Sequence, residues 1–175
     1  NTAIYNGGGV YLLGDTTTFT QAGNSRIAHN HTISEESVGG GVFVDHGQAW
    51  LTGGVIYSNT SSYGGGLYIY AGQVLLTDGI IAENAASEGG GVHINSSVFT
   101  QTGGAIVNNH ADWNGGGVYV TDGSFTLVNG QVAGNTAGEY GGGVYADVGL
   151  ATMYAGEISN NSAIWGGGVA ARDQN

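Results

Sequence analysis

Gly64-Gly65-Gly66-Leu67-Tyr68-Ile69 is one of seven similar stretches in this 175-residue chain. Each stretch consists of three glycines and a triplet with an apolar residue, a variable residue and a second apolar residue. The stretches begin at Gly7, Gly39, Gly64, Gly89, Gly115, Gly141 and Gly166, so the interval is nearly constant after a longer first one. Self-similarity at a fixed period of about 25 residues is typical of a stacked repeat architecture.

A second motif, Ile or Val followed three positions later by Asn, recurs between the glycine runs. Its asparagines are Asn30, Asn59, Asn84, Asn109, Asn135 and Asn161. The spacing from the first glycine to this Asn is the same in five of six repeats and is longer in the first, where residues 15–18 look like an insertion. The segment from the Asn to the next glycine run is short, as between Asn84 and Gly89, but is longer after Asn30. One part of the repeat therefore has a fixed length, and one turn tolerates insertion, as loops on a rigid scaffold do.

Each repeat predicts three short strands: the triplet after the glycines, a middle segment such as residues 74–77, and the apolar pair before the Asn. Gly, Asn, Asp and Ser fill the corners between them. The repeat is too short for a propeller blade, and no segment has a helical period. The sequence therefore predicts an all-β fold, a right-handed parallel β-helix (β-solenoid) with three short strands and about 25 residues per coil. Six to seven coils make a rod about 30 Å long.

Residues 1–175 read as a single β-helix repeat segment, and we expect the segment to be part of a longer chain. It opens inside a repeat, because residues 1–5 parallel residues 161–165. It contains no cysteine, so disulfides and thiol chemistry are excluded for this segment. No apolar run is long enough for a membrane-spanning helix, so we expect no membrane insertion by this segment.

The chain is strongly acidic. It has 2 Lys and Arg residues against 13 Asp and Glu residues, which gives a net charge of −11. We expect no nucleic-acid partner, because neutralising phosphates requires lysine and arginine. Attraction to anionic lipid is disfavoured for the same reason.

The two motifs together resemble the repeats of chlamydial polymorphic outer-membrane proteins and of adhesin-like surface proteins of bacteria and gut methanogens. Those repeats carry Phe-x-x-Asn and Gly-Gly-Ala-[Ile/Leu/Val]. Here the Asn positions match, but Ile or Val replaces Phe in all six repeats. Gly103-Gly104-Ala105-Ile106 matches the second motif literally, whereas the other copies read Gly-Gly-Gly-[Val/Leu]. The resemblance implies secretion, an extracellular or cell-surface location, an anchor elsewhere in the chain, and adhesion.

A column of mostly aromatic residues is the main candidate for partner binding. Alternation along a strand sends the middle residue of each triplet away from the core. This column contains Tyr11, Phe43, Tyr68, His93, Tyr119 and Tyr145. We expect its rings to face solvent about 4.8 Å apart, where they would contact a glycan or a protein. The alternative is that the stacked rings only stabilise the sheet.

The asparagine column has a structural interpretation, because stacked amides can hydrogen-bond from coil to coil. We therefore expect a ladder of Asn30, Asn59, Asn84, Asn109, Asn135 and Asn161. Four glycosylation sequons occur, at Asn30, Asn59, Asn95 and Asn160. The first two belong to the ladder and are expected to be too buried, which leaves Asn95 and Asn160 as candidate sites.

The sequence does not favour an enzyme. A glycosidase needs two carboxylates facing each other across a cleft, and here only Asp45, Asp122 and Asp147 fall near one turn. The two arginines lie near opposite ends, and there is no lysine. His29 and His31 are spaced to chelate a metal, but we favour a solvated loop there. We expect no catalytic residues, no metal and no cofactor.

Two functions remain open. The first is a non-catalytic extracellular β-helix module of a cell-surface adhesin or stalk protein. Its aromatic column would contact a glycan or protein on a host or neighbouring cell. The second is a structural filament subunit whose copies stack end to end, because open solenoid ends expose unpaired strand edges.

Overall fold

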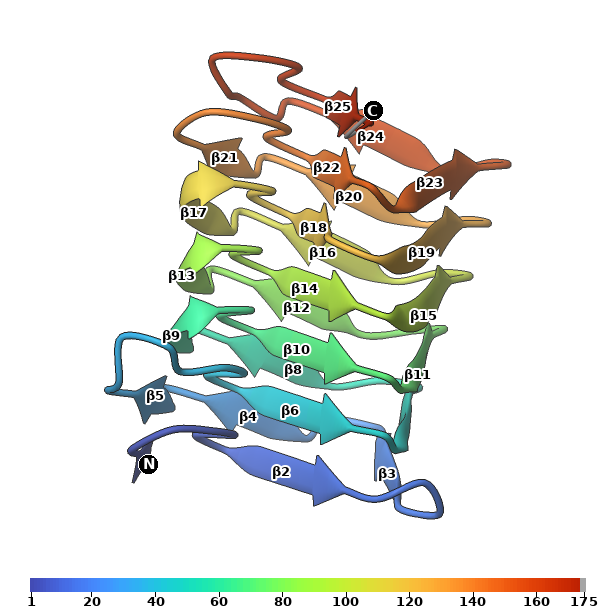
Figure 1. Cartoon of the computed structure of the whole chain (residues 1–175). Coiled ribbons are helices and arrows are strands. Elements are labelled where there is room, and N and C mark those ends of the chain that lie inside the picture. The colour runs from blue at the N-terminus through green and yellow to red at the C-terminus, as the bar shows by residue number, and fades with distance from the viewer. Residues whose placement is uncertain (174–175) are drawn as a thin grey trace.

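The computed structural model describes residues 1–173, which form a parallel β-solenoid of about seven turns (Figure 1). Each strand pairs in parallel with its counterpart one coil away, as Leu67 does with Val92 and Val92 with Val118. The first repeat is longer, and there Val10 pairs with Val42. The predicted repeat period and the predicted solenoid are therefore confirmed.

The strands form four sheets, so the expectation of three strands per coil is wrong. We name the sheets A to D in the order in which the chain enters them. Sheets B, C and D correspond to the three predicted strands. Sheet A occupies the stretch between the Asn and the glycine run, which reads as a turn in the sequence.

Sheet A is built from short polar segments. Its strands are β1 (Thr2–Ala3), β5 (His31–Thr32), β9 (Thr60–Tyr63), β13 (Ala85–Glu88), β17 (His110–Asn114) and β21 (Thr136–Ala137). A segment such as β9 has no apolar alternation and gives no strand signal. It is a strand because its backbone N–H and C=O groups pair with those of β5 and β13. Small residues such as Ala86 and Ala111 fill its buried positions.

Sheet B follows the glycine runs and has one strand more than the other sheets. Its strands are β2 (Val10–Leu13), β6 (Val42–Asp45), β10 (Leu67–Tyr70), β14 (Val92–Asn95), β18 (Val118–Val120), β22 (Val144–Asp147) and β25 (Val169–Arg172). The first and third residues of each triplet, such as Leu67 and Ile69, point into the core.

Sheet C contains the predicted middle strands. They are β3 (Thr18–Gln21), β7 (Gln48–Leu51), β11 (Gln73–Leu76), β15 (Ser97–Gln101), β19 (Gly123–Leu127) and β23 (Leu150–Met153). Val74 and Leu76 point into the core, whereas Trp50 and Leu75 lie partly exposed on the outer face.

Sheet D contains the short strands before the Asn corner. They are β4 (Arg26–Ala28), β8 (Val55–Tyr57), β12 (Ile80–Ala82), β16 (Ala105–Val107), β20 (Gln131–Ala133) and β24 (Glu157–Ser159). The middle residue of each strand, such as Ile81 or Ile106, belongs to the core, so the two flanking residues face outward.

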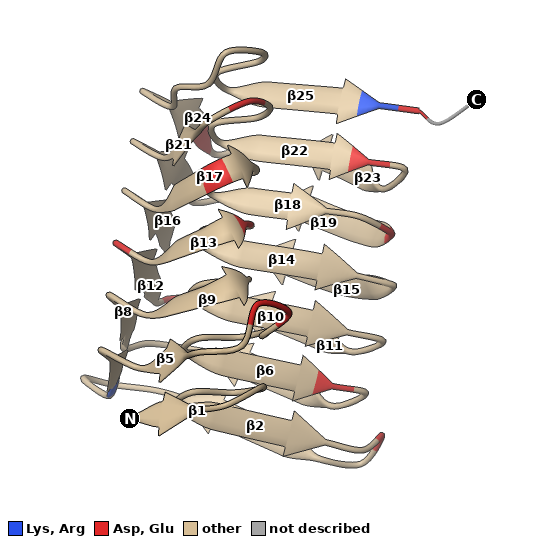
Figure 2. Cartoon of the chain, turned by 60° about the vertical axis from the view of Figure 1, so that its left-hand side comes forward, with Lys and Arg blue, Asp and Glu red and all other residues tan. Residues whose placement is uncertain are grey.

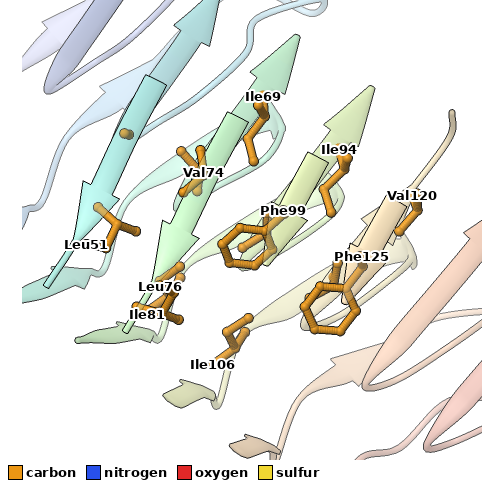
Figure 3. Packing of buried hydrophobic residues seen from close by; sticks show 14 of the residues in the cluster. Leu51, Ile69, Val74, Leu76, Ile81, Ile94, Phe99, Ile106, Val120 and Phe125 are labelled. Atoms are coloured by element: carbon orange, nitrogen blue, oxygen red, sulfur yellow. The ribbon is translucent and has the colours of Figure 1, made fainter. Parts of the chain in front are cut away.

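Sheets B, C and D enclose one continuous apolar core (Figure 3). Phe99 and Phe125 stack in successive coils with ring centroids 5.6 Å apart. Ile94 of sheet B and Ile106 of sheet D are buried in the same cluster. Each coil thus buries its layer against its neighbours, and the stability is approximately a sum over adjacent coil interfaces.

The glycine run brings the backbones of adjacent coils into close contact. Its first member has a φ between 61° and 65° in all seven copies, a conformation in which a side chain is strained. The third member is restricted by its neighbours instead. A Cβ on Gly91 would lie 2.6 Å from the backbone oxygen of Gly117 in the next coil.

The corner between sheets B and C places non-glycine residues at positive φ. These residues are His46, Ala71, Ser96 and Val148. Val148 suits this corner least, because it is β-branched and has a φ of 65°. Its side chain is exposed, so little burial depends on it.

We expect Val148→Asn to raise the free energy of unfolding by about 1 kcal/mol, because Asn tolerates the left-handed region that strains valine. Chemical denaturation would measure the change. Val128→Asn is the matched control, since Val128 is also exposed but has no positive φ. Equal destabilisation by both substitutions would show that the corner is not strained.

Candidate functional site

The aromatic column runs up the face of sheet B that points away from the core. Its six members are in register, as Tyr68 is with Phe43 on one side and His93 on the other. Centroids of neighbouring rings are 4.7 to 5.4 Å apart. The column is thus a continuous series of ring contacts from Tyr11 to Tyr145, stacked at both ends and tilted or edge-on in between.

The expectation that these rings face solvent is wrong for most of them. Phe43, His93, Tyr119 and Tyr145 are at most 5% exposed, Tyr68 is partly buried, and only Tyr11 in the end coil is exposed.

Tyr63 and Tyr140, each directly before a glycine run, cover two members of the column. The ring centroid of Tyr63 lies 5.8 Å from that of His93, and the ring centroid of Tyr140 lies 5.4 Å from that of Tyr145. Strand alternation identifies side chains that point away from the main core, but it does not show whether another segment of the chain covers them.

Several polar atoms of the column have partners inside the protein, but Nδ1 of the buried His93 has no hydrogen-bond partner among residues 1–173. Burial lowers the pKa of His93 to about 3, so this ring is neutral at physiological pH. Its Nε2 lies 3.2 Å from Oγ1 of Thr121. The Tyr119 hydroxyl donates to Oδ2 of Asp147 at 3.4 Å, and burial raises the pKa of Tyr119. The Arg172 side chain donates two further hydrogen bonds to Asp147, at 2.9 and 3.1 Å.

The six asparagines of the second motif stack at the corner between sheets D and A. Five are at most 3% exposed, and Asn161 in the last coil is partly exposed. The backbone N–H and the Nδ2 of Asn84 both donate to Oδ1 of Asn109, at 3.0 Å each. Asn109 Nδ2 in turn donates to the carbonyl of Ile81, at 3.0 Å. Every buried amide of the ladder thus bonds to the coils on both sides.

Asn1 is a seventh member of this ladder, which the motif search does not find because no Ile-x-x precedes it. Its Nδ2 donates to Oδ1 of Asn30 at 2.7 Å. Thr2 pairs with His31, which places Asn1 in register with Asn30. The sequence signal is the similarity of residues 1–5 to residues 161–165, which aligns Asn1 with Asn161.

The candidate glycosylation residues differ in exposure. Asn160 directly precedes the ladder residue Asn161 and is exposed. Asn95 is partly buried, and its side-chain amide donates to the Tyr68 hydroxyl at 3.2 Å. Asn30 and Asn59 are buried in the ladder.

A groove on the outer face of sheet A was not expected from the sequence. It consists of two hollows that meet at Ser87. The first runs from His31 and Glu35 across Thr60 and Ser62. The second is lined by Tyr63, Ser87, Glu88, Trp113 and Asn114. The groove therefore combines hydroxyl groups and carboxylates with an aromatic edge.

A β-bulge forms part of this edge. Ala86 pairs with Ala111 and Glu88 with Asn114, so Asp112 and Trp113 together lie opposite the single residue Ser87. Trp113 is 54% exposed. Bulges re-aim side chains and are over-represented beside functional sites. The sequence signal is one additional residue between Asn109 and its following glycine run, compared with the preceding coil.

The groove is acidic. Glu35, Glu88 and Asp112 line it, and burial raises the pKa of Glu88. The nearby histidines bond within sheet A: His31 Nδ1 lies 2.5 Å from Thr60 Oγ1, and His110 Nε2 lies 3.3 Å from Asp112. Elsewhere the acidic residues are scattered along the rod (Figure 2).

The histidines and acids of the described residues do not form a metal-binding cluster. Among residues 1–173, no three His, Asp or Glu side chains come together to hold a metal ion. His29 packs edge-on against Tyr57, with centroids 5.7 Å apart, and does not share a partner with His31. Within the same residues no helix is long and apolar enough to cross a membrane.

The fold and the groove together define a parallel β-solenoid with one grooved, polar sheet. Comparisons with protein-family models, with curated proteins and with solved structures find no match to this chain. The groove and the repeat motifs are therefore the features of this chain that bear on its function.

Proposed function

We propose that the chain is a non-catalytic β-solenoid module of an extracellular adhesin or stalk protein, and that it binds a neutral glycan along the groove of sheet A. The observation that carries the proposal is the bulge that turns Trp113 outward at the edge of this groove. The resemblance of the motif pair to polymorphic outer-membrane and adhesin-like repeats supports the surface location. The proposal includes right-handed winding, the usual hand of parallel crossovers.

The lining of the groove fits a sugar. An exposed indole offers an apolar face on which a sugar ring can pack. Ser87 offers a hydroxyl and Asp112 a carboxylate for hydrogen bonds to sugar hydroxyls. The hydroxyls of Thr60 and Ser62, already bonded to His31 and to the Ser34 carbonyl, can accept further hydrogen bonds. Carboxylates repel anions, so neutral glycans are favoured over acidic ones. Scattered acids and the lack of lysine remain the argument against catalysis.

A panel of neutral and acidic oligosaccharides tests this proposal. We expect the protein to bind at least one neutral glycan and no acidic one. Trp113→Ala should weaken that binding about tenfold, because a stacked ring contributes roughly 1 kcal/mol or more. Tyr154→Ala is the control, since Tyr154 is 76% exposed but does not line the groove. Equal losses from both variants, or no neutral ligand at all, would contradict the proposal.

A filament subunit is the second candidate, because the last coil leaves an apolar hollow lined by Phe125, Val144, Ile158 and Val169. Electron microscopy of the purified chain distinguishes filaments from short rods.

A further inference from the structure

The outer face of sheet D is an apolar strip that the proposed function does not use. Its apolar residues flank the buried middle position of each strand. They are Ala28, Val55, Tyr57, Ile80, Ala82, Ala105, Val107 and Ala133, and the polar flanking residues are Arg26, Gln131, Glu157 and Ser159. Ile80 is 43% exposed, and Val107 is partly exposed. The strip covers the six parallel strands of sheet D, which lie on one side of the rod (Figure 1).

The two ends of this strip carry opposite charges. Arg26 lies on β4, the first strand, and Glu157 lies on β24, the last, at the same position along their strands. The Arg26 guanidinium carbon lies 5.9 Å from the centre of the Tyr57 ring, which holds it over the strip. The ion pairs within residues 1–173 are His46–Asp45, His110–Asp112 and Arg172–Asp147, so neither end residue is in one of them.

We propose that the outer face of sheet D binds a second copy of this chain, with the two solenoid axes antiparallel. The twofold axis would run along the strands, between the two faces, at the level midway between β12 and β16. This operation places β4 opposite β24 of the partner, β8 opposite β20, and β12 opposite β16. Arg26 of each copy then meets Glu157 of the other, which gives two symmetric ion pairs.

The side chains across this interface are complementary in size. Ile80 faces Ala105 of the partner subunit, and Tyr57 faces the partner's Ala133. Val107 likewise faces the partner's Ala82. A large residue thus meets a small one at each of these three positions, so the two faces can interdigitate.

The carboxylates at the margins support the same arrangement. Asp78 and Glu83 are exposed beside β12. In the antiparallel dimer they face Gly103 of the partner subunit and the partner's Asn108, so no acid lies directly opposite another acid. With parallel axes, β12 would face its own copy, and Asp78 would lie near the partner's Glu83. Like charges therefore disfavour the parallel alternative.

The dimer should be weak. Three positions on each of six strands make a strip of about 10 by 29 Å. A dimer through this strip therefore buries roughly 600 Å² in total, which is about half of the smallest area that stable complexes bury. The net charge of −11 per chain adds repulsion at low salt. Association is therefore expected only at high protein concentration or between chains held close together.

Sedimentation equilibrium at about 0.15 M salt and up to about 1 mM protein tests the proposal. We expect the wild-type chain to dimerise. Arg26→Glu and Glu157→Arg should each weaken the dimer about tenfold, because each reversal replaces two attractive pairs with two repulsive ones. The double variant Arg26→Glu/Glu157→Arg should restore the wild-type affinity to within about threefold.

The single reversals move the net charge in opposite directions, from −11 to −13 and to −9, so a general charge effect cannot weaken both. Leu75→Glu on the outer face of sheet C is the control and should leave the dimer unchanged. Thermal melts of each variant confirm that it is folded. A monomeric wild-type chain, an insensitive dimer, or a double variant as weak as the singles would each overturn the proposal.

Discussion

Asn109→Ala is expected to lower the free energy of unfolding by about 4 kcal/mol, the largest effect of any single substitution that we consider. The substitution removes the acceptor for the backbone N–H and the Nδ2 of Asn84, and the donor to the carbonyl of Ile81. All three groups lie in a buried column, where each unsatisfied group costs about 1–3 kcal/mol. Urea denaturation followed by circular dichroism would measure the loss.

Asn108→Ser is the matched control for this substitution. Asn108 precedes Asn109 in the chain, is exposed, and occupies the corner position that Ser58 occupies two coils earlier. We expect its replacement to change stability by less than about 0.5 kcal/mol. Similar losses from the two substitutions would mean that the ladder does not hold the coils together.

Gly91→Ala is expected to lower the free energy of unfolding by about 3 kcal/mol. The added Cβ would lie 2.6 Å from the backbone oxygen of Gly117 and 2.9 Å from Nδ2 of Asn109. Neither neighbour can move without separating two coils or breaking the ladder, so overpacking here is at the upper end of its usual cost. Thermal and chemical denaturation of the variant would measure the effect.

Gly168→Ala tests the same repeat position where, among residues 1–173, no further coil packs against it. A Cβ on Gly168 meets only Cγ2 of Ile158, at an ordinary contact distance of 3.7 Å. We therefore expect a change of less than about 0.5 kcal/mol. If Gly168→Ala costs as much as Gly91→Ala, the glycine run is required for local backbone conformation and not for contact between coils.

Much of the fold follows from the spacing of two motifs. The glycine runs and the Ile-x-x-Asn motif give the period, the parallel stacking and three of the four sheets. They do so because equivalent residues of successive coils hydrogen-bond to each other, so residues one period apart in the sequence are neighbours in adjacent coils. The register of Leu67 with Val92 and of Asn84 with Asn109 is an example.

The fourth sheet could not be predicted in this way. Its strands are held by backbone pairing between coils, and β9 consists of Thr, Ser and Tyr, which as a single copy gives no apolar pattern. The burial of the aromatic column has a related cause. Tyr63 belongs to β9 of sheet A, and Tyr140 is bridged to Asn114 of β17. The sheet that the sequence did not predict therefore also positions the residues that cover the column.

The candidate site depends on the same missing sheet. Trp113 and Asp112 look like turn residues in the sequence, and only the pairing of β17 with β13 shows that they form a bulge beside a groove. The contact surface that we propose is therefore the groove of sheet A and not the predicted column of rings, although Tyr11 and part of Tyr68 remain exposed.

A paired measurement of binding and stability on two aromatic variants tests this assignment most directly. Trp113→Ala removes the exposed ring of the groove, and Tyr119→Ser removes a buried ring of the column. With the neutral glycan found for the wild-type protein, we predict that Trp113→Ala weakens binding about tenfold and leaves the melting temperature nearly unchanged. Tyr119→Ser should lower the melting temperature by several degrees and leave binding by the folded protein unchanged. The opposite result, with binding lost in Tyr119→Ser and retained in Trp113→Ala, would contradict the account.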